Sequence, residues 1–173
     1  MKEIRCHENY PLWIVLLSNI VSLTIYATGA FVVYNIGWIW LILYVLYIAG
    51  LEIRLLKRSC VNCHYYGKVC AFGKGKLCRL FFKKGDPNKF KQDKITWKDM
   101  VPDLMVSLIP IVAGTIILLI DFNWLILSMV LLLLVVSSLG NGLIRGFFAC
   151  KYCRQREIGC PAEQLFNKNK SKT

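Results

Sequence analysis

Apolar residues fall into four long runs along the chain, separated by short polar turns or long basic segments. The runs cover residues 12–33, 36–51 with an extension to 56, 101–120 and 124–144. A helix needs about 20 such residues to cross the hydrocarbon of a bilayer. The second run reaches that length only if Glu52 and Arg54 snorkel toward the headgroups. The pattern predicts an all-α polytopic membrane protein with four transmembrane helices.

The runs are grouped in pairs. YNIG (residues 34–37) joins the first pair and DFN (residues 121–123) the second, and Asn, Asp and Gly are turn formers. We therefore expect two tandem helical hairpins. The predicted segments are an N-terminus (1–10), a first hairpin (11–56), a cysteine-rich basic loop (57–100), a second hairpin (101–145) and a cysteine-rich tail (146–173).

Composition agrees with the membrane assignment. Hydrophobic residues make up 56% of the 173 residues and charged residues 18%, with a mean hydropathy of +0.49. These values are too apolar for a soluble domain of this length. The first apolar run is too long for the core of a signal peptide and is followed at once by another span, so we expect the N-terminus to be retained.

Positive charge predicts the orientation. All 22 Lys and Arg residues lie in residues 2–5, in residues 54–98 or from residue 145 onward, and neither short turn contains one. With four spans these three regions share one side, which the positive-inside rule makes cytoplasmic. The expected location is the cell membrane, with both termini and all eight cysteines on the cytoplasmic side.

Two cysteine segments repeat one spacing on that side. CVNCHYYGKVC (residues 60–70) and CKYCRQREIGC (residues 150–160) both read Cys-x2-Cys-x6-Cys, at a constant offset of 90. Each follows a proline, a helix, a tight turn and a second helix. We infer an internal duplication of a two-helix unit, in parallel orientation, that brings the two segments together.

Cysteines in a reducing compartment favour metal binding over disulfides. A quinone-linked disulfide-forming enzyme, another class of four-helix membrane protein, would carry them on the opposite side. A Cys-x-x-Cys pair lets two thiolates reach one ion, and nearby Lys and Arg favour the thiolate form. The predicted metal ligands are Cys60, Cys63, Cys70, Cys78, Cys150, Cys153 and Cys160.

The second segment also resembles half of the fungal binuclear zinc cluster. Its halves have the same spacing, with basic residues between the second and third cysteines, and six cysteines hold two zinc ions through two bridging sulfurs. The resemblance implies the ligand set Cys60, Cys63, Cys70, Cys150, Cys153 and Cys160. Here, however, a long loop and two membrane helices separate the halves, and no DNA-binding role is implied.

Two ligand arrangements remain open at this stage. The six repeated cysteines could share ions, or Cys78 could complete a four-cysteine site within the loop while Cys6, His7 or His64 completes the other. Ligand type favours zinc, with an iron–sulfur cluster as the alternative. Reversible dithiol chemistry is a further alternative, and Cys6 or Cys78 taken alone is typical of a palmitoylation site.

The expected function combines these features. The central loop mixes Lys and Arg with Phe81, Phe82 and Phe90, a pattern that suits anionic lipid headgroups or a protein partner better than nucleic acid. With two histidines and no paired carboxylates, catalysis has little support. We expect a structural zinc site that forms a basic platform at the membrane, or alternatively a membrane-bound redox or electron-transfer protein.

Overall fold

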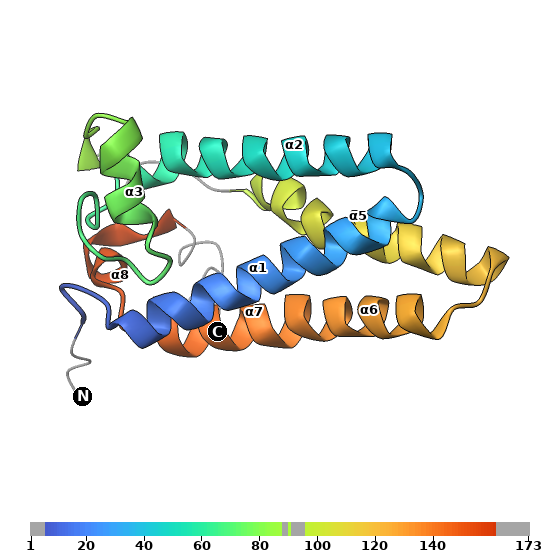
Figure 1. Cartoon of the computed structure of the whole chain (residues 1–173). Coiled ribbons are helices and arrows are strands. Elements are labelled where there is room, and N and C mark those ends of the chain that lie inside the picture. The colour runs from blue at the N-terminus through green and yellow to red at the C-terminus, as the bar shows by residue number, and fades with distance from the viewer. Residues whose placement is uncertain (1–5, 88–89, 91–95, 162–173) are drawn as a thin grey trace.

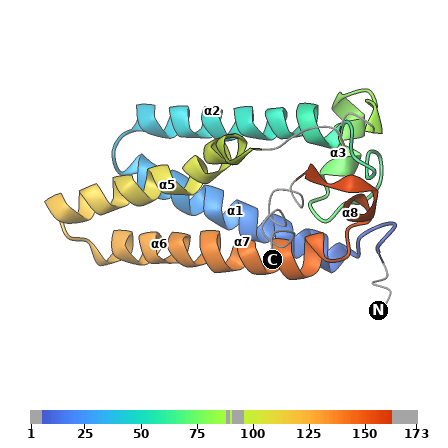
Figure 2. The same ribbon diagram turned by 180° about the vertical axis from the view of Figure 1, so that it is seen from behind.

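The computed structural model describes residues 6–87, 90 and 96–161. Figure 1 shows four long helical segments lying side by side, and Figure 2 shows the same bundle from behind. Within the described residues, β-type pairing is limited to one isolated bridge, between His7 and Cys153. The fold is all-helical, as the sequence predicts, and the four long segments correspond to the four apolar runs.

The first hairpin consists of α1 (Leu12–Tyr34) and α2 (Trp38–Leu55). α1 begins directly after Pro11, whose restricted φ suits the start of a helix. Gly37 in the turn has a φ of 155°, which favours glycine because a side chain would be strained there. α2 then continues without a break into a π-helical turn, η1 (Leu56–Cys60).

The second hairpin consists of α5 (Trp97–Ile120) and α6 (Trp124–Val135). α5 starts four residues before the predicted run, because Asp99 Oδ2 accepts hydrogen bonds from the Thr96 amide (3.0 Å) and hydroxyl (2.8 Å). Asn123 caps α6 by accepting from the Leu125 amide at 2.8 Å. The last span continues through η2 (Val136–Gly140), α7 (Asn141–Leu143) and η3 (Ile144–Cys150).

A proline within α5 determines one contact between the hairpins. Pro110 has no amide hydrogen, so the carbonyl of Val106, four residues earlier, lacks its helical donor. The Tyr44 hydroxyl of α2 donates to this carbonyl at 2.7 Å. Gly29 of α1 leaves the space that the Tyr44 hydroxyl occupies. A backbone group freed inside the apolar bundle is thus satisfied by a neighbouring helix.

Small residues and aliphatic side chains fill the rest of the bundle. At Gly114 of α5 an added Cβ would clash with Val130 of α6, so the two helices approach closely there. The buried core beside this contact is Ile25, Val33, Tyr44, Val106 and Leu133.

The outside of the bundle is apolar. Leu119 is 83% exposed and Ile39 is 73% exposed, with many similar side chains on all four segments. Among the described residues, four helices are long and apolar enough to cross a membrane: Leu12–Tyr34, Trp38–Cys60, Trp97–Ile120 and Trp124–Cys150. A surface of this kind is stable in contact with lipid and costly in water. The fold is that of a multi-pass membrane protein.

Three described segments outside the spans gather at one end of the bundle. We call them the head: residues 6–11, 61–86 and 151–161. The head contains two short helices, α3 (Lys74–Phe81) and α8 (Arg154–Gly159), which lie together beyond the ends of the spans in both views.

Candidate functional site

The two cysteine segments begin with the same backbone structure. The π-helical turn η1 ends at Cys60, and η3 ends at Cys150. The amide of Cys63 then donates to the Cys60 carbonyl at 3.4 Å, and that of Cys153 to the Cys150 carbonyl at 3.3 Å. Three residues on, Tyr66 donates to Cys63 (3.0 Å) and Arg156 to Cys153 (3.1 Å). Equal sequence spacing is therefore matched by equal hydrogen bonding.

The segment of residues 7–10 lies between the two cysteine segments and pairs with both. The amide of His7 donates to the Tyr152 carbonyl at 3.0 Å. The amide of Tyr10 donates to the Val69 carbonyl at 3.0 Å, and the Val69 amide donates to Asn9 Oδ1 at 3.1 Å. Residues at the start of the chain thus join the central loop to the tail.

A buried core supports this arrangement. It consists of Tyr10, Ile14, Tyr65, Ala71 and Ala149, and Cys63, Cys70 and Cys153 pack against it. The Tyr65 hydroxyl donates to the His7 carbonyl and accepts from the Arg154 amide at 3.0 Å. The His64 amide donates to Gln155 Oε1 at 2.7 Å. The thiols of both segments therefore lie on one shared structure.

Glu8 adds an ionic contact across the same junction. Its carboxylate lies 2.9 Å from Lys68 Nζ of the central loop and 3.6 Å from Arg154 of the tail. The hydrogen bond from Lys68 lowers the pKa of Glu8. The carboxylate is 59% exposed, so the pair contributes little stability by itself and mainly orients the three segments.

The thiols of the two motifs lie near one another around Cys63. Burial is the main cause that raises the pKa of Cys63, and negative charge on Cys153, Cys70 or Cys160 would raise it further. Cys60 is near Cys70, Cys78 and Cys63 in the same sense. The structure therefore brings both repeated motifs together, and Cys78 lies with the loop cysteines. Within the described part of the chain none of the eight cysteines forms a disulfide.

Backbone amides point at several of the sulfurs. The Tyr65 amide donates to Cys63 Sγ, and the Gln155 amide donates to Cys153 Sγ, each from two residues further along the chain. The Gly75 amide donates to Cys70 Sγ at 3.4 Å. Such donors stabilise negative charge on sulfur and accompany many metal-bound thiolates.

Burial opposes the effect of these donors, because it disfavours the charged form of a thiol. It raises the pKa of Cys63 to about 12, and it also raises the pKa of Cys153 and Cys78. At neutral pH these thiols keep their protons. Binding a cation would therefore require the release of those protons.

The predicted ligands are close together but do not form a ready-made site. Within residues 6–87, 90 and 96–161, no three His, Cys, Asp or Glu side chains form a group that could hold a metal ion. Cys78 is fully buried, and its thiol donates to the Leu56 carbonyl at 3.7 Å, whereas Cys150 is exposed. A metal site would need the thiols to move closer together.

The three additional candidate ligands differ in their surroundings. Cys6 donates to Glu157 at 3.1 Å, and the His7 ring packs on Tyr10 and Tyr152. His64 Nε2 is buried and has no hydrogen-bond partner among the described residues. An unsatisfied imidazole nitrogen next to Cys63 makes His64 the best suited of the three to complete a site.

Several residues that build the head could not be recognised from the sequence. Glu8, Asn9 and Tyr10 lie in a short polar stretch without a motif, and Tyr65 and Gln155 lie between cysteines at positions that the Cys-x2-Cys-x6-Cys spacing leaves unspecified. Their roles depend on hydrogen bonds between segments far apart in the sequence. Periodicity and spacing describe only local structure, so neither could have identified them.

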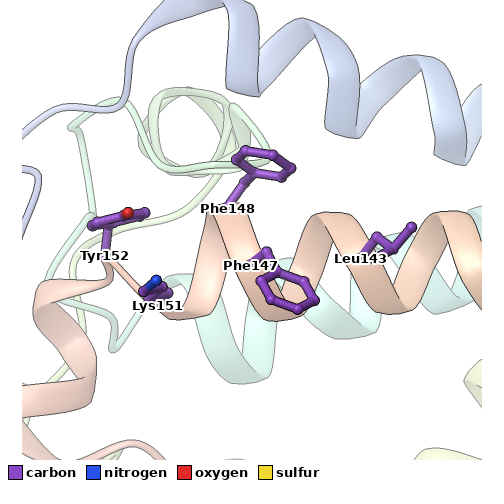
Figure 3. Close-up of a pocket in the computed structure, with 5 residues that line it drawn as sticks. All are labelled: Leu143, Phe147, Phe148, Lys151 and Tyr152. Atoms are coloured by element: carbon purple, nitrogen blue, oxygen red, sulfur yellow. The ribbon is translucent and has the colours of Figure 1, made fainter.

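A shallow apolar hollow of about 380 Å³ lies next to Cys150, outside the thiol groups (Figure 3). Leu143 and Phe147 line it on the last span, and Lys151 lies near its end, with Nζ 5.7 Å from the centre of the Tyr152 ring. Phe148 packs edge-on against Trp13 of α1. The hollow opens on the apolar outside of the bundle and suits contact with lipid chains rather than a reaction.

Comparisons with protein-family models, with curated proteins and with solved structures found no match for this chain.

Proposed function

We propose that the protein is an integral membrane protein whose head lies in the cytoplasm and binds a structural metal ion, zinc, through its cysteines. The observation that carries the proposal is the placement of two identical cysteine motifs side by side, with backbone amides donating to Cys63 and Cys153 at equivalent positions. Zinc would cross-link the central loop to the tail and hold the head as a basic platform for anionic lipid or a protein partner.

The proposal includes an internal duplication of the hairpin. Two observations support it beyond the spacing of the cysteines. The second span of each hairpin ends in a π-helical turn, and this turn stops at the first cysteine of the motif that follows. The hydrogen bonds that follow Cys60 recur after Cys150 at the same offset. Two related hairpins would each contribute one half of the thiol site.

The residues suit zinc in number and type. Seven cysteines and His64 supply more soft donors than one tetrahedral ion requires. Zinc binding would displace thiol protons, and the amides that face Cys63, Cys153 and Cys70 would stabilise the resulting thiolates. The basic residues nearby, Lys68 and Arg154 among them, would offset the negative charge.

Metal analysis of protein purified without oxygen tests the proposal. We expect at least one zinc per chain, no visible colour, and loss of the metal in Cys63→Ser and Cys153→Ser. Cys6→Ser is the matched control, because Cys6 lies outside both repeated motifs and its thiol donates to the Glu157 carboxylate, and it should keep the metal. Metal far below one ion per chain, in protein whose thiols are intact, would contradict the proposal.

The second candidate is a membrane-bound redox or electron-transfer protein. It is favoured by the neighbouring thiols, which form no disulfide and, among the described residues, do not converge on one point. An iron–sulfur centre would make the purified protein brown and would give iron and sulfide on analysis. Reactive dithiols would instead give metal-free protein in which Cys63 forms a disulfide on mild oxidation.

A further inference from the structure

Helix α3 carries an apolar face that nothing in the described structure covers. Leu77 is 44% exposed, Leu80 78% and Phe81 70%. Their spacing of i, i+3 and i+4 places the three side chains on one side of the helix. Exposed apolar side chains grouped in this way mark a contact surface.

The opposite side of α3 packs tightly against the head. Gly75 is buried, and a Cβ at this position would lie 2.5 Å from the Lys68 carbonyl oxygen and would also clash with that of Tyr65. Cys78 is fully buried beside Leu56. Because this side faces the head, Leu77, Leu80 and Phe81 point away from it. The helix is therefore fixed in orientation and cannot turn its apolar side inward.

The start of α3 is anchored to two of the spans. Lys74 Nζ lies 2.6 and 2.8 Å from the carboxylate oxygens of Glu52 in α2. Glu52 also accepts from the Tyr26 hydroxyl of α1 at 2.7 Å. Both views show α3 crossing the end of α2 rather than continuing along it (Figures 1 and 2). This is the direction that a helix in the plane of the membrane would take.

Positive charge surrounds the apolar face. Lys76 lies on a flank of α3, and Lys83 and Lys84 follow its end, and all three side chains are exposed. Apolar residues on one side of a helix and cations beside them are the two features by which interfacial helices bind anionic bilayers.

We propose that α3 lies on the cytoplasmic bilayer surface, with Leu77, Leu80 and Phe81 inserted below the headgroups and the neighbouring cations bound to anionic phospholipid. The inference rests on the platform part of the proposed function and names the segment that makes the contact. The occupant is lipid, because the apolar face adjoins the ends of the membrane spans and its cations match anionic headgroups.

Depth-dependent quenching tests the inference on the full chain in nanodiscs. An environment-sensitive fluorescent amino acid is placed at position 80, 81 or 79, and the phospholipids carry a nitroxide on the acyl chain near the headgroup. Position 79 is the matched control, because the Arg79 side chain lies against Gly67 on the head side of α3. We expect probes at 80 and 81 to lose about half of their fluorescence and the probe at 79 to lose little.

A change of lipid composition tests whether the cations near α3 contribute to membrane binding. Quenching at position 81 should be stronger in phosphatidylcholine mixed with phosphatidylglycerol than in phosphatidylcholine alone, and Lys83→Gln with Lys84→Gln should remove that difference. Equal quenching at 79 and 81, or none at either, would overturn the inference. A blue-shifted but unquenched probe at 81 would also overturn it, since α3 would then contact protein. Zinc content of the same samples separates these outcomes from failure of the metal proposal.

Discussion

At the scale of single residues, the hydroxyl of Tyr44 shows how a sequence irregularity is compensated elsewhere. Pro110 removes one hydrogen bond from α5, and a side chain from α2 replaces it. The sequence alone does not reveal that Tyr44 compensates for Pro110, because 66 positions separate the two residues. The compensation is visible only once α2 and α5 are packed together.

This contact gives a direct prediction. Tyr44→Phe should lower the free energy of unfolding by about 1–3 kcal/mol, because the Val106 carbonyl would be left without a donor in an apolar environment. Tyr47→Phe is the matched control: the Tyr47 hydroxyl donates to the Pro102 carbonyl at 2.8 Å, but that carbonyl keeps the Val106 amide as its helical partner. Unfolding in detergent measures both. Equal losses for the two variants would contradict the explanation.

At the scale of elements, residues 7–10 hold the two cysteine segments together, and Glu8 makes this contact sensitive to pH. The pKa of Glu8 is lower in the folded protein than its ordinary value of 4.5, because Lys68 stabilises the carboxylate. The contribution to stability is therefore complete above pH 4.5 and is lost as the pH falls through the lower folded value.

We expect amide exchange in residues 7–10 to accelerate, relative to the intrinsic rate at the same pH, as the pH falls below 4.5. In Glu8→Gln this additional acceleration should be absent, since the amide does not titrate. Exchange followed by mass spectrometry measures the effect, and the long spans provide an internal reference. The same acceleration in Glu8→Gln would assign the pH dependence to other groups.

Prediction from the sequence succeeded for the spans and was incomplete at their ends. Hydropathy located α1 to within one residue, because a run of about 20 apolar residues is typical of a membrane-spanning helix and of few other structures. It missed the first turn of α5, where Thr96 and Asp99 are polar but form a cap. It also missed that the second and fourth spans continue as π-helical turns to Cys60 and Cys150.

The candidate site was predictable only in part. The spacing identified the cysteines, and the structure places both motifs side by side. The metal, its number and its ligand set stay predictions, because the described side chains do not converge on one point. The core of Tyr10, Tyr65 and Ala149 could not be predicted, since it depends on packing between the first, middle and last parts of the chain.

At the scale of the whole molecule, the distribution of charge predicts the orientation. All eight cysteines lie either in the head or at the ends of the spans that adjoin it. The turn of residues 121–123 lies at the opposite end of the spans. A membrane-impermeant maleimide should therefore leave the wild-type chain unlabelled in intact cells and should label it after permeabilisation, with exposed Cys150 as the most accessible thiol.

Phe122→Cys provides the opposite readout. Phe122 is 56% exposed in the turn between α5 and α6, so the new thiol should react in intact cells. Labelling of the wild-type chain in intact cells, together with protection of the cysteine at position 122, would reverse the orientation and move the head outside.

The pairing of His7 with Tyr152 also has a consequence for biosynthesis. His7 precedes all four spans, and it meets Tyr152 and Cys153 only after residue 153 has been made and the spans have been inserted. Until then, the central cysteines lack the tail that packs beside them, and their thiols are open to oxidation or to the wrong metal. We expect the newly made chain to pass through a vulnerable interval, which ends when the tail arrives and the head closes.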